Sequence, residues 1–135
     1  MTLCAQLKEE FLNEIEVLIN GWKEKSIKLA SEGSSDEAIL ETIKANIGDI
    51  FYKLFNVSYK NSCKNVESDE IELRKLSKAY FDFFEKIPAP WRAKMAKDKE
   101  YNIIEEYYKE QIKLETVAEI KNLFIKYYNR FYKEV

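Results

Sequence analysis

Apolar residues recur at every third or fourth position along most of the chain, which is the spacing of one face of an α-helix. The first such stretch runs from about Leu3 to Glu32. Its apolar positions are Leu7, Phe11, Ile15, Leu18, Trp22 and Leu29. Gly33 follows at a point where helices often end in a left-handed residue, so the pattern predicts one long helix. Gly21 lies inside it and suggests that a neighbouring helix approaches closely there.

Two more helices are predicted from residues that favour helix starts. Ser34 and Ser35 precede acidic residues, which suit the free N–H groups and the positive dipole end of a helix. The core positions that follow are Ile39, Ile43, Ile47, Ile50, Leu54 and Val57, widened by Leu40, Phe51 and Phe55. This second helix should end near Asn61. Ser68 starts a third helix in the same way, with the core positions Ile71, Leu76, Tyr80, Phe83 and Ile87.

The last part of the chain is harder to divide into helices. Pro88 and Pro90 end the third helix, because the residue before a proline disfavours helical geometry. From Trp91 to Glu134 there is no further glycine or proline. The apolar face nevertheless shifts direction along this segment. We favour a break near Asp98, with a short helix over about 91–96 and a long helix from about Lys99. One continuous helix that changes partners midway or extends beyond the bundle remains the alternative.

Together these elements predict one all-α domain over residues 1–135. Short connections between long helices favour antiparallel neighbours, which gives an up-down-up-down four-helix bundle with the short extra helix at about 91–96. Three glycines and two prolines are too few for a fold built of many strands and turns. No internal repeat, low-complexity linker or second domain is apparent in the sequence.

Charge and hydropathy point to a cytoplasmic protein. The chain has 22 basic and 24 acidic residues and a net charge of -2, so it carries no overall basic field for nucleic acid. No apolar run approaches the ~20 residues of a membrane span, and we expect neither a signal peptide nor membrane association. Cys4 and Cys63 fall at helix ends that meet in an antiparallel hairpin. Reduced thiols are expected in the cytoplasm, although a disulfide between them is geometrically possible.

The residue types present leave little room for catalysis. The sequence has no histidine, which removes Ser–His and Cys–His nucleophile pairs and histidine ligands for zinc, haem or di-iron centres. There is no Cys-x-x-Cys pair for zinc and no glycine-rich phosphate loop. Acidic runs such as Glu105, Glu106 and Glu110 differ by one residue from the Glu-Glu-x-x-Glu motif of all-helical nucleotide pyrophosphatases. We therefore expect no enzyme activity, no cofactor and no metal.

The C-terminal third is the best candidate for an interaction surface. It holds about half of the aromatic residues, and they occupy more than one helix face. Surplus aromatic faces often mark association surfaces. The candidate residues are Trp91, Arg92, Tyr107, Tyr108, Tyr127, Tyr128 and Tyr132, with the basic residues Lys126, Arg130 and Lys133. The alternative is that these tyrosines lie half-buried at the rim of the bundle with their hydroxyls in water.

These features lead to three hypotheses about function. The first is a non-enzymatic bundle that acts through protein–protein contacts, as a homodimer or with another protein. The second is an accessory module that binds nucleic acid or another acidic partner through Lys126, Arg130 and Lys133. The third is a small-molecule site between helices. Its lining would include Trp22, Phe51 and Tyr80, which otherwise belong to the core.

Overall fold

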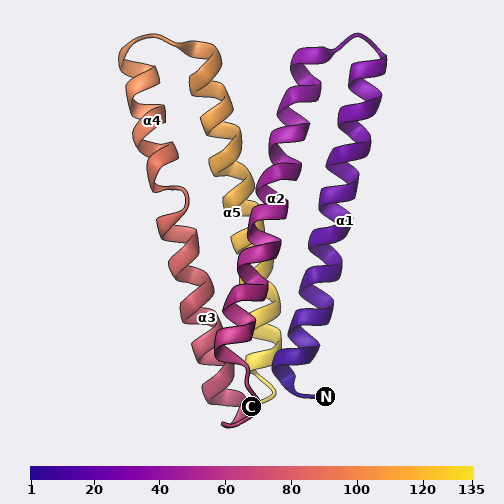
Figure 1. Cartoon of the computed structure of the whole chain (residues 1–135), viewed down its shortest axis with the longest axis vertical. Helices are drawn as coiled ribbons and strands as arrows, with labels where there is room; N and C mark the ends of the chain where they lie inside the picture. The colour runs from indigo at the N-terminus through magenta and orange to yellow at the C-terminus, as the bar shows by residue number, and fades with distance from the viewer.

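The computed structural model describes all 135 residues, which form five helices and no strand. The helices are α1 (Leu3–Ser31), α2 (Ser35–Ser62), α3 (Asp69–Lys86), α4 (Ala89–Glu100) and α5 (Ile104–Tyr132). Because α4 continues the direction of α3, the five helices make four antiparallel columns that run up, down, up and down (Figure 1). The predicted all-α four-helix architecture is therefore confirmed.

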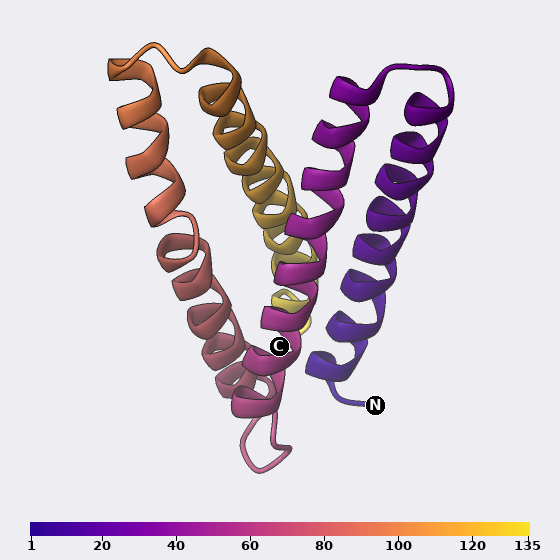
Figure 2. The same ribbon diagram turned by 45° about the horizontal axis from the view of Figure 1, so that its top comes forward.

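The four columns form a V rather than a uniform bundle. They meet at the end that holds both termini and separate toward the other end (Figures 1 and 2). We call the joined part the base, residues 3–19, 45–62, 69–87 and 117–132. The first arm is residues 20–44 and the second arm is residues 88–116. The buried apolar cluster includes no residue of α4, none of α1 beyond Ile19 and none of α5 before Val117, so the core lies in the base.

Aromatic rings fill the centre of the base. Tyr80 is fully buried, and its ring centroid lies 5.2 Å from that of Phe55 and 4.9 Å from that of Phe124. Its hydroxyl donates a 2.9 Å hydrogen bond to the backbone carbonyl of Phe51. Burial raises the pKa of Tyr80 well above its ordinary value. Tyr80 and Phe51, two of the residues considered for a small-molecule site, are thus part of the core.

Both arms end in the same left-handed turn. Gly33, with φ of 84°, follows α1, and the N–H of Ser34 donates to the carbonyl of Leu29 at 2.8 Å. Asn102, with φ of 57°, follows α4 with the equivalent hydrogen bond from Ile103. This is the Schellman arrangement, in which the left-handed residue allows the last helical carbonyls to be satisfied.

The prediction of two helices after Pro90 is confirmed, but its boundaries were wrong. The short helix runs to Glu100 instead of ending near residue 96, and the long helix begins at Ile104 instead of about Lys99. Asn102 explains the difference, because asparagine adopts the left-handed conformation without the signal that a glycine would give.

A set of residues in the first half of the chain recurs in the second half at an offset of 69 positions (91 minus 22). The matched residues include Trp22 and Trp91, Lys25 and Lys94, Glu41 and Glu110, Ile43 and Ile112, Lys44 and Lys113, and Phe55 and Phe124. The left-handed Gly33 and Asn102 also correspond. A half-turn about the vertical axis of Figure 1 approximately exchanges the hairpin of α1 and α2 with that of α3, α4 and α5. The chain therefore contains a repeated helical hairpin, and the expectation of no internal repeat was wrong.

The buried face of α2 differs from the one predicted. Ile39, Ile50 and Val57 were expected in the core, but their exposed fractions are 46%, 36% and 46%. Ile47, Phe51 and Phe55 are buried as predicted. The other buried residues of α2 are small or polar: Ala38, Glu41, Ala45, Gly48, Ser58 and Ser62. The third helix shows a similar error, because Ile71 is 44% exposed.

A glycine accounts for the close packing of α2 on α1. A Cβ atom at Gly48 would lie 2.6 Å from Cγ1 of Ile19 and 3.3 Å from the ring of Trp22. Gly21, which was expected to permit this approach, has open space around it. The close contact is therefore made by the glycine of the second helix.

A buried carboxylate organises the connection between α2 and α3. Glu72 accepts backbone N–H bonds from Asn65, Val66 and Glu67 at 3.2, 3.0 and 3.2 Å. Burial opposes its ionisation, but the three donors outweigh burial and lower the pKa of Glu72. Ser68 caps α3 by accepting from the N–H of Ile71, as predicted.

Cys4 and Cys63 lie beside each other at the base. Cys4 is fully buried and Cys63 is half-buried, and both are free thiols. A hydrogen bond with Cys4, together with burial, raises the pKa of Cys63 far above its ordinary range. The two helix ends therefore meet, as the hairpin predicted.

None of the five helices combines the length and the apolar character that crossing a membrane requires.

Candidate interaction surface

The aromatic and basic residues near the C-terminus are largely engaged within the chain. Tyr127 donates a hydrogen bond to Glu14 of α1. Arg130 donates two hydrogen bonds, of 2.7 and 2.9 Å, to the carboxylate of Glu10. These contacts hold α5 against α1 in the base. The predicted surface therefore has fewer free polar groups here than its sequence indicates.

The two remaining tyrosines of this group face α3. Tyr132 accepts a 3.0 Å hydrogen bond from Arg74 and donates one of 3.3 Å to Glu70. Tyr128 stacks between Phe124 and Tyr132, with ring centroids 5.9 and 5.4 Å away. Lys126 and Lys133 remain exposed.

The pKa of Tyr127 offers a direct test of its contact with Glu14. The hydrogen bond to the Glu14 carboxylate favours the neutral phenol and raises the pKa of Tyr127 to about 12, from an ordinary value of 10.0. The contribution of this contact to stability should be fully present below about pH 10 and disappear as the pH rises through about 12. We expect the difference in free energy of unfolding between wild type and Tyr127→Phe to shrink over that range, as measured by urea denaturation. A difference that stays constant with pH would contradict the contact, and Glu14→Gln should lower the pKa of Tyr127 toward its ordinary value, with burial and Glu10 still raising it.

The other candidate residues lie in the second arm. Trp91 is half-buried, with Nζ of Lys113 placed 5.5 Å from its ring centroid, whereas Arg92 is exposed. Tyr107 is half-buried and lines a hollow of about 280 Å³ at the end of α4. Tyr108 is 49% exposed. The structure therefore separates the ten candidate residues into one group at the base and one group in the second arm.

The end of the second arm carries an exposed apolar surface, which we call the tip patch. It consists of Tyr101, Ile103, Ile104 and Tyr108, whose exposed fractions are 69%, 46%, 77% and 49%. In the first arm the matched positions are Glu32, Ser34, Ser35 and Ile39, so the three positions at the turn are polar and only Ile39 is apolar. Sequence reasoning included Tyr108 but missed the two isoleucines, because nothing local distinguishes an exposed isoleucine from a core one.

A groove lies between the two arms beside the tip patch. It has a volume of about 280 Å³, and its walls come from the first turns of α2 and α5. We call it the inter-arm groove. Its lining residues are Asp36, Glu37, Ile39, Leu40, Glu105, Tyr108 and Lys109. It thus combines an apolar surface with three acidic side chains and one lysine.

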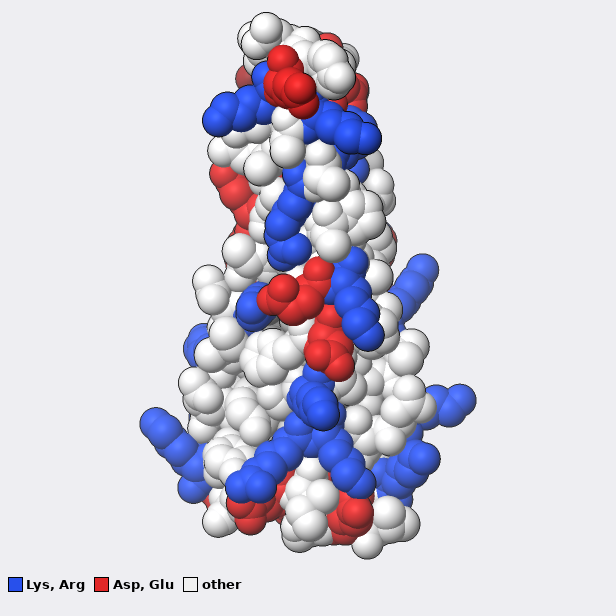
Figure 3. Space-filling model, turned by 90° about the vertical axis from the view of Figure 1, so that its left-hand side faces the viewer, with Lys and Arg blue, Asp and Glu red and all other residues white.

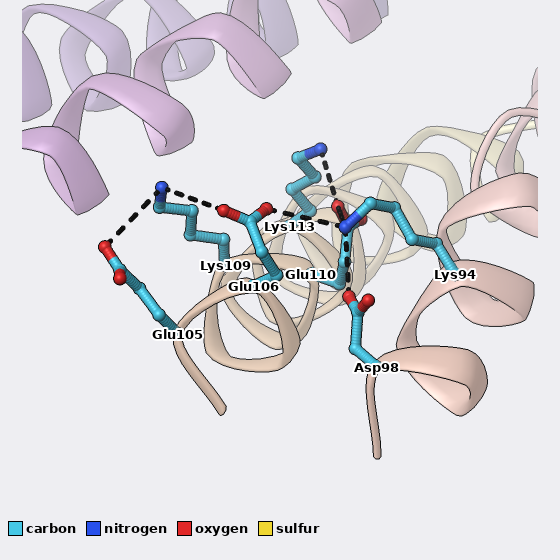
Figure 4. A network of polar contacts seen from close by, with 7 residues as sticks. All are labelled: Lys94, Asp98, Glu105, Glu106, Lys109, Glu110 and Lys113. Atoms are coloured by element: carbon cyan, nitrogen blue, oxygen red, sulfur yellow. Dashed lines mark hydrogen bonds and ion pairs between the residues drawn. The ribbon is translucent and has the colours of Figure 1, made fainter. Parts of the chain in front are cut away.

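Each arm also contains a buried carboxylate held by lysines. In the second arm, Glu110 lies 3.1 Å from Lys113 and 3.7 Å from Lys94 (Figure 4). In the first arm the matched Glu41 lies 3.2 Å from Lys44 and 3.3 Å from Lys25. Both glutamates are at least 95% buried, and in each the second carboxylate oxygen has no hydrogen-bond partner.

The network of the second arm is larger than that of the first. Lys94 also contacts Asp98 at 3.0 Å and Glu106 at 3.4 Å, and Lys109 continues the chain of contacts from Glu106 (Figure 4). The bond to Asp98, opposed by desolvation, raises the pKa of Lys94. Lys109 lowers the pKa of Glu106. In the second arm, α4 is therefore connected to α5 by the ion pairs of Lys94 with Glu106 and Glu110, and not by residues of the buried apolar cluster.

No group of three or more Asp, Glu or Cys side chains is placed to hold a metal ion. Comparisons of the chain with protein-family models, with curated proteins and with solved structures find no match.

Proposed function

We propose that the protein is a non-enzymatic helical scaffold that self-associates through the open end of the V. The observation that carries this proposal is the tip patch. Four large apolar or aromatic side chains are exposed on the second arm, and three of the four matched positions on the first arm are polar.

The repeat supplies an internal comparison for the tip patch. Gly33 and Asn102 make the same left-handed turn with the same hydrogen-bond pattern, so the turn itself needs no isoleucine. Exposed contiguous apolar surface is unfavourable in water and commonly marks an association site. Ile103 and Ile104 are therefore better explained by a contact than by the fold.

The base is a weaker candidate for the interface. Tyr127, Arg130 and Tyr132 already have partners within the chain. A substitution at Tyr128 would also disturb its stacking on Phe124, a core residue. Binding of nucleic acid through Lys126, Arg130 and Lys133 has less support for the same reason, because Arg130 is held by the Glu10 carboxylate and only the two lysines of this group remain free.

The substitution Ile104→Lys tests the proposal. Wild type is expected to form a dimer as its concentration rises. Burying an isoleucine is worth about 1.5–3 kcal/mol, and a symmetric dimer buries it in both copies, so a lysine at this position should weaken the dimer by at least roughly 100-fold. Sedimentation velocity over a concentration series, supported by native mass spectrometry, would measure the change.

Ser35→Lys is the matched control, because Ser35 occupies the same position at the start of α2 as Ile104 at the start of α5. Both variants should retain the helical content and thermal unfolding of wild type. A wild type that remains monomeric at every concentration, or equal weakening by both substitutions, would show that the tip patch is not the interface.

A further inference from the structure

We infer that the inter-arm groove of one copy binds the basic outer face of α4 of a second copy. This inference rests on the proposed self-association and names the two surfaces that meet. It depends on the charges that each surface leaves unpaired.

The inter-arm groove is acidic as well as apolar. Asp36 and Glu37 stand on its α2 side and make no ion pair within the chain. Glu105 stands on the α5 side, with its one contact to Lys109 at 3.9 Å. Lys109 is in turn closer to Glu106, at 3.4 Å. The groove is therefore left with net negative charge around the apolar side chains.

The outer face of α4 is mainly basic, with Glu100 as its one acidic residue, and it has no covering helix. α4 packs on α5, and its other side faces solvent. Arg92, Lys97 and Lys99 are exposed and make no ion pair. Lys94, in contrast, is turned inward to Asp98 and Glu110. Figure 3 views the edge formed by α3 and α4 and shows lysine and arginine side chains spread along it, with acidic side chains among them.

Both surfaces adjoin the tip patch. α4 ends where the patch begins, and Tyr108 belongs to the patch and to the inter-arm groove. Two copies that bury their tip patches against each other therefore bring the α4 of each close to the groove of the other. A two-fold contact uses each surface twice and closes the assembly at a dimer. Complementary charge at its rim would set orientation and specificity more than affinity.

Charge reversal of each surface, separately and in a mixture, tests the inference. The groove variant is Asp36→Lys with Glu37→Lys, and the helix variant is Arg92→Glu with Lys97→Glu. Each variant alone places like charges at both contacts of its own dimer. We expect each to dimerise at least roughly 10-fold more weakly than wild type in sedimentation equilibrium at low salt.

The mixture of the two variants is the decisive measurement. In the mixed dimer the reversed groove meets the reversed helix, and the native groove meets the native helix, so both contacts are again complementary. We expect the mixture to form a heterodimer with an affinity near that of wild type, identified by native mass spectrometry. The matched control is Lys23→Glu with Lys28→Glu, at the equivalent positions of the first arm, which should leave the dimer unchanged.

The outcomes separate this inference from the proposal on which it rests. If the reversals leave dimerisation unchanged while Ile104→Lys abolishes it, the inference is wrong and self-association stands. If each reversal weakens the dimer but the mixture does not recover it, the groove receives a different segment and the inference is again wrong. If wild type is monomeric throughout, both the inference and the proposed function are wrong.

Discussion

Phe124→Ala is expected to lower the free energy of unfolding by about 3–5 kcal/mol. Phe124 is fully buried and comes from α5, and its ring meets rings from the other three columns of the base. The centroids of Phe11, Phe55 and Tyr80 lie 5.4, 6.2 and 4.9 Å from its own. An alanine would leave a cavity at the point where all four columns share contacts, and the surrounding rings could close it only in part.

Urea denaturation followed by circular dichroism would measure this loss. Val66→Ala is the control, because Val66 is 79% exposed and lies far from the tip patch, so its removal should change stability by no more than about 0.5 kcal/mol. A loss below about 1 kcal/mol for Phe124→Ala would mean that the base is less tightly packed than the ring contacts indicate.

Glu110→Leu is expected to raise the free energy of unfolding, by about 1–4 kcal/mol, although it removes two ion pairs. The Glu110 carboxylate is almost fully buried, and one of its oxygens has no partner. Leaving a buried polar atom unsatisfied costs about 1–3 kcal/mol. Lys113 is 26% exposed and Lys94 is 46% exposed, so both lysines could return to water once the carboxylate is gone.

The first arm provides the companion measurement. Glu41→Leu removes the equivalent carboxylate and should have an effect of the same sign. Glu106→Leu removes an exposed member of the same network and should leave the urea midpoint nearly unchanged. A clear loss of stability for Glu110→Leu would show that the ion pairs outweigh the cost of burial. A gain would indicate that the carboxylates serve to align the helices of each arm rather than to stabilise them.

The helices themselves were predictable because their ends carry local signals. Ser68 and Gly33 act within one turn of the helix end that they define, so the sequence alone locates them. The break at Asn102 was harder to place, because asparagine takes a left-handed conformation less often than glycine and is common elsewhere.

The buried face of α2 was not predictable from apolar residues alone. Its line of Ala38, Ala45 and Gly48 gives a weak hydrophobic signal, whereas the exposed Ile39 and Ile50 give a strong one. The close approach of α1 selects small residues on this face. Glu41 weakens the hydrophobic pattern of this face further. A glutamate in a sequence normally indicates an exposed position, and only the structure shows that Glu41 is buried beside two lysines.

The candidate surface was predicted only in part. The aromatic residues of α5 were correctly identified as more numerous than one helix face requires. Their partners at the base, such as Glu10 and Glu14, come from the opposite end of the sequence, and no local pattern connects them. The self-associating surface at the open end remains a proposal that the substitutions described above can test.

The absence of a shared core in the arms has a mechanical consequence. The base is stiff, because moving one column there would separate interlocked rings. The arms continue from it and contribute little to the buried apolar cluster, so we expect a change in the angle between them to bend α2 and α5 without separating the rings of the base. We therefore expect the base to stay rigid while the distance between the two arms varies, so that the width of the inter-arm groove can adapt to a bound partner.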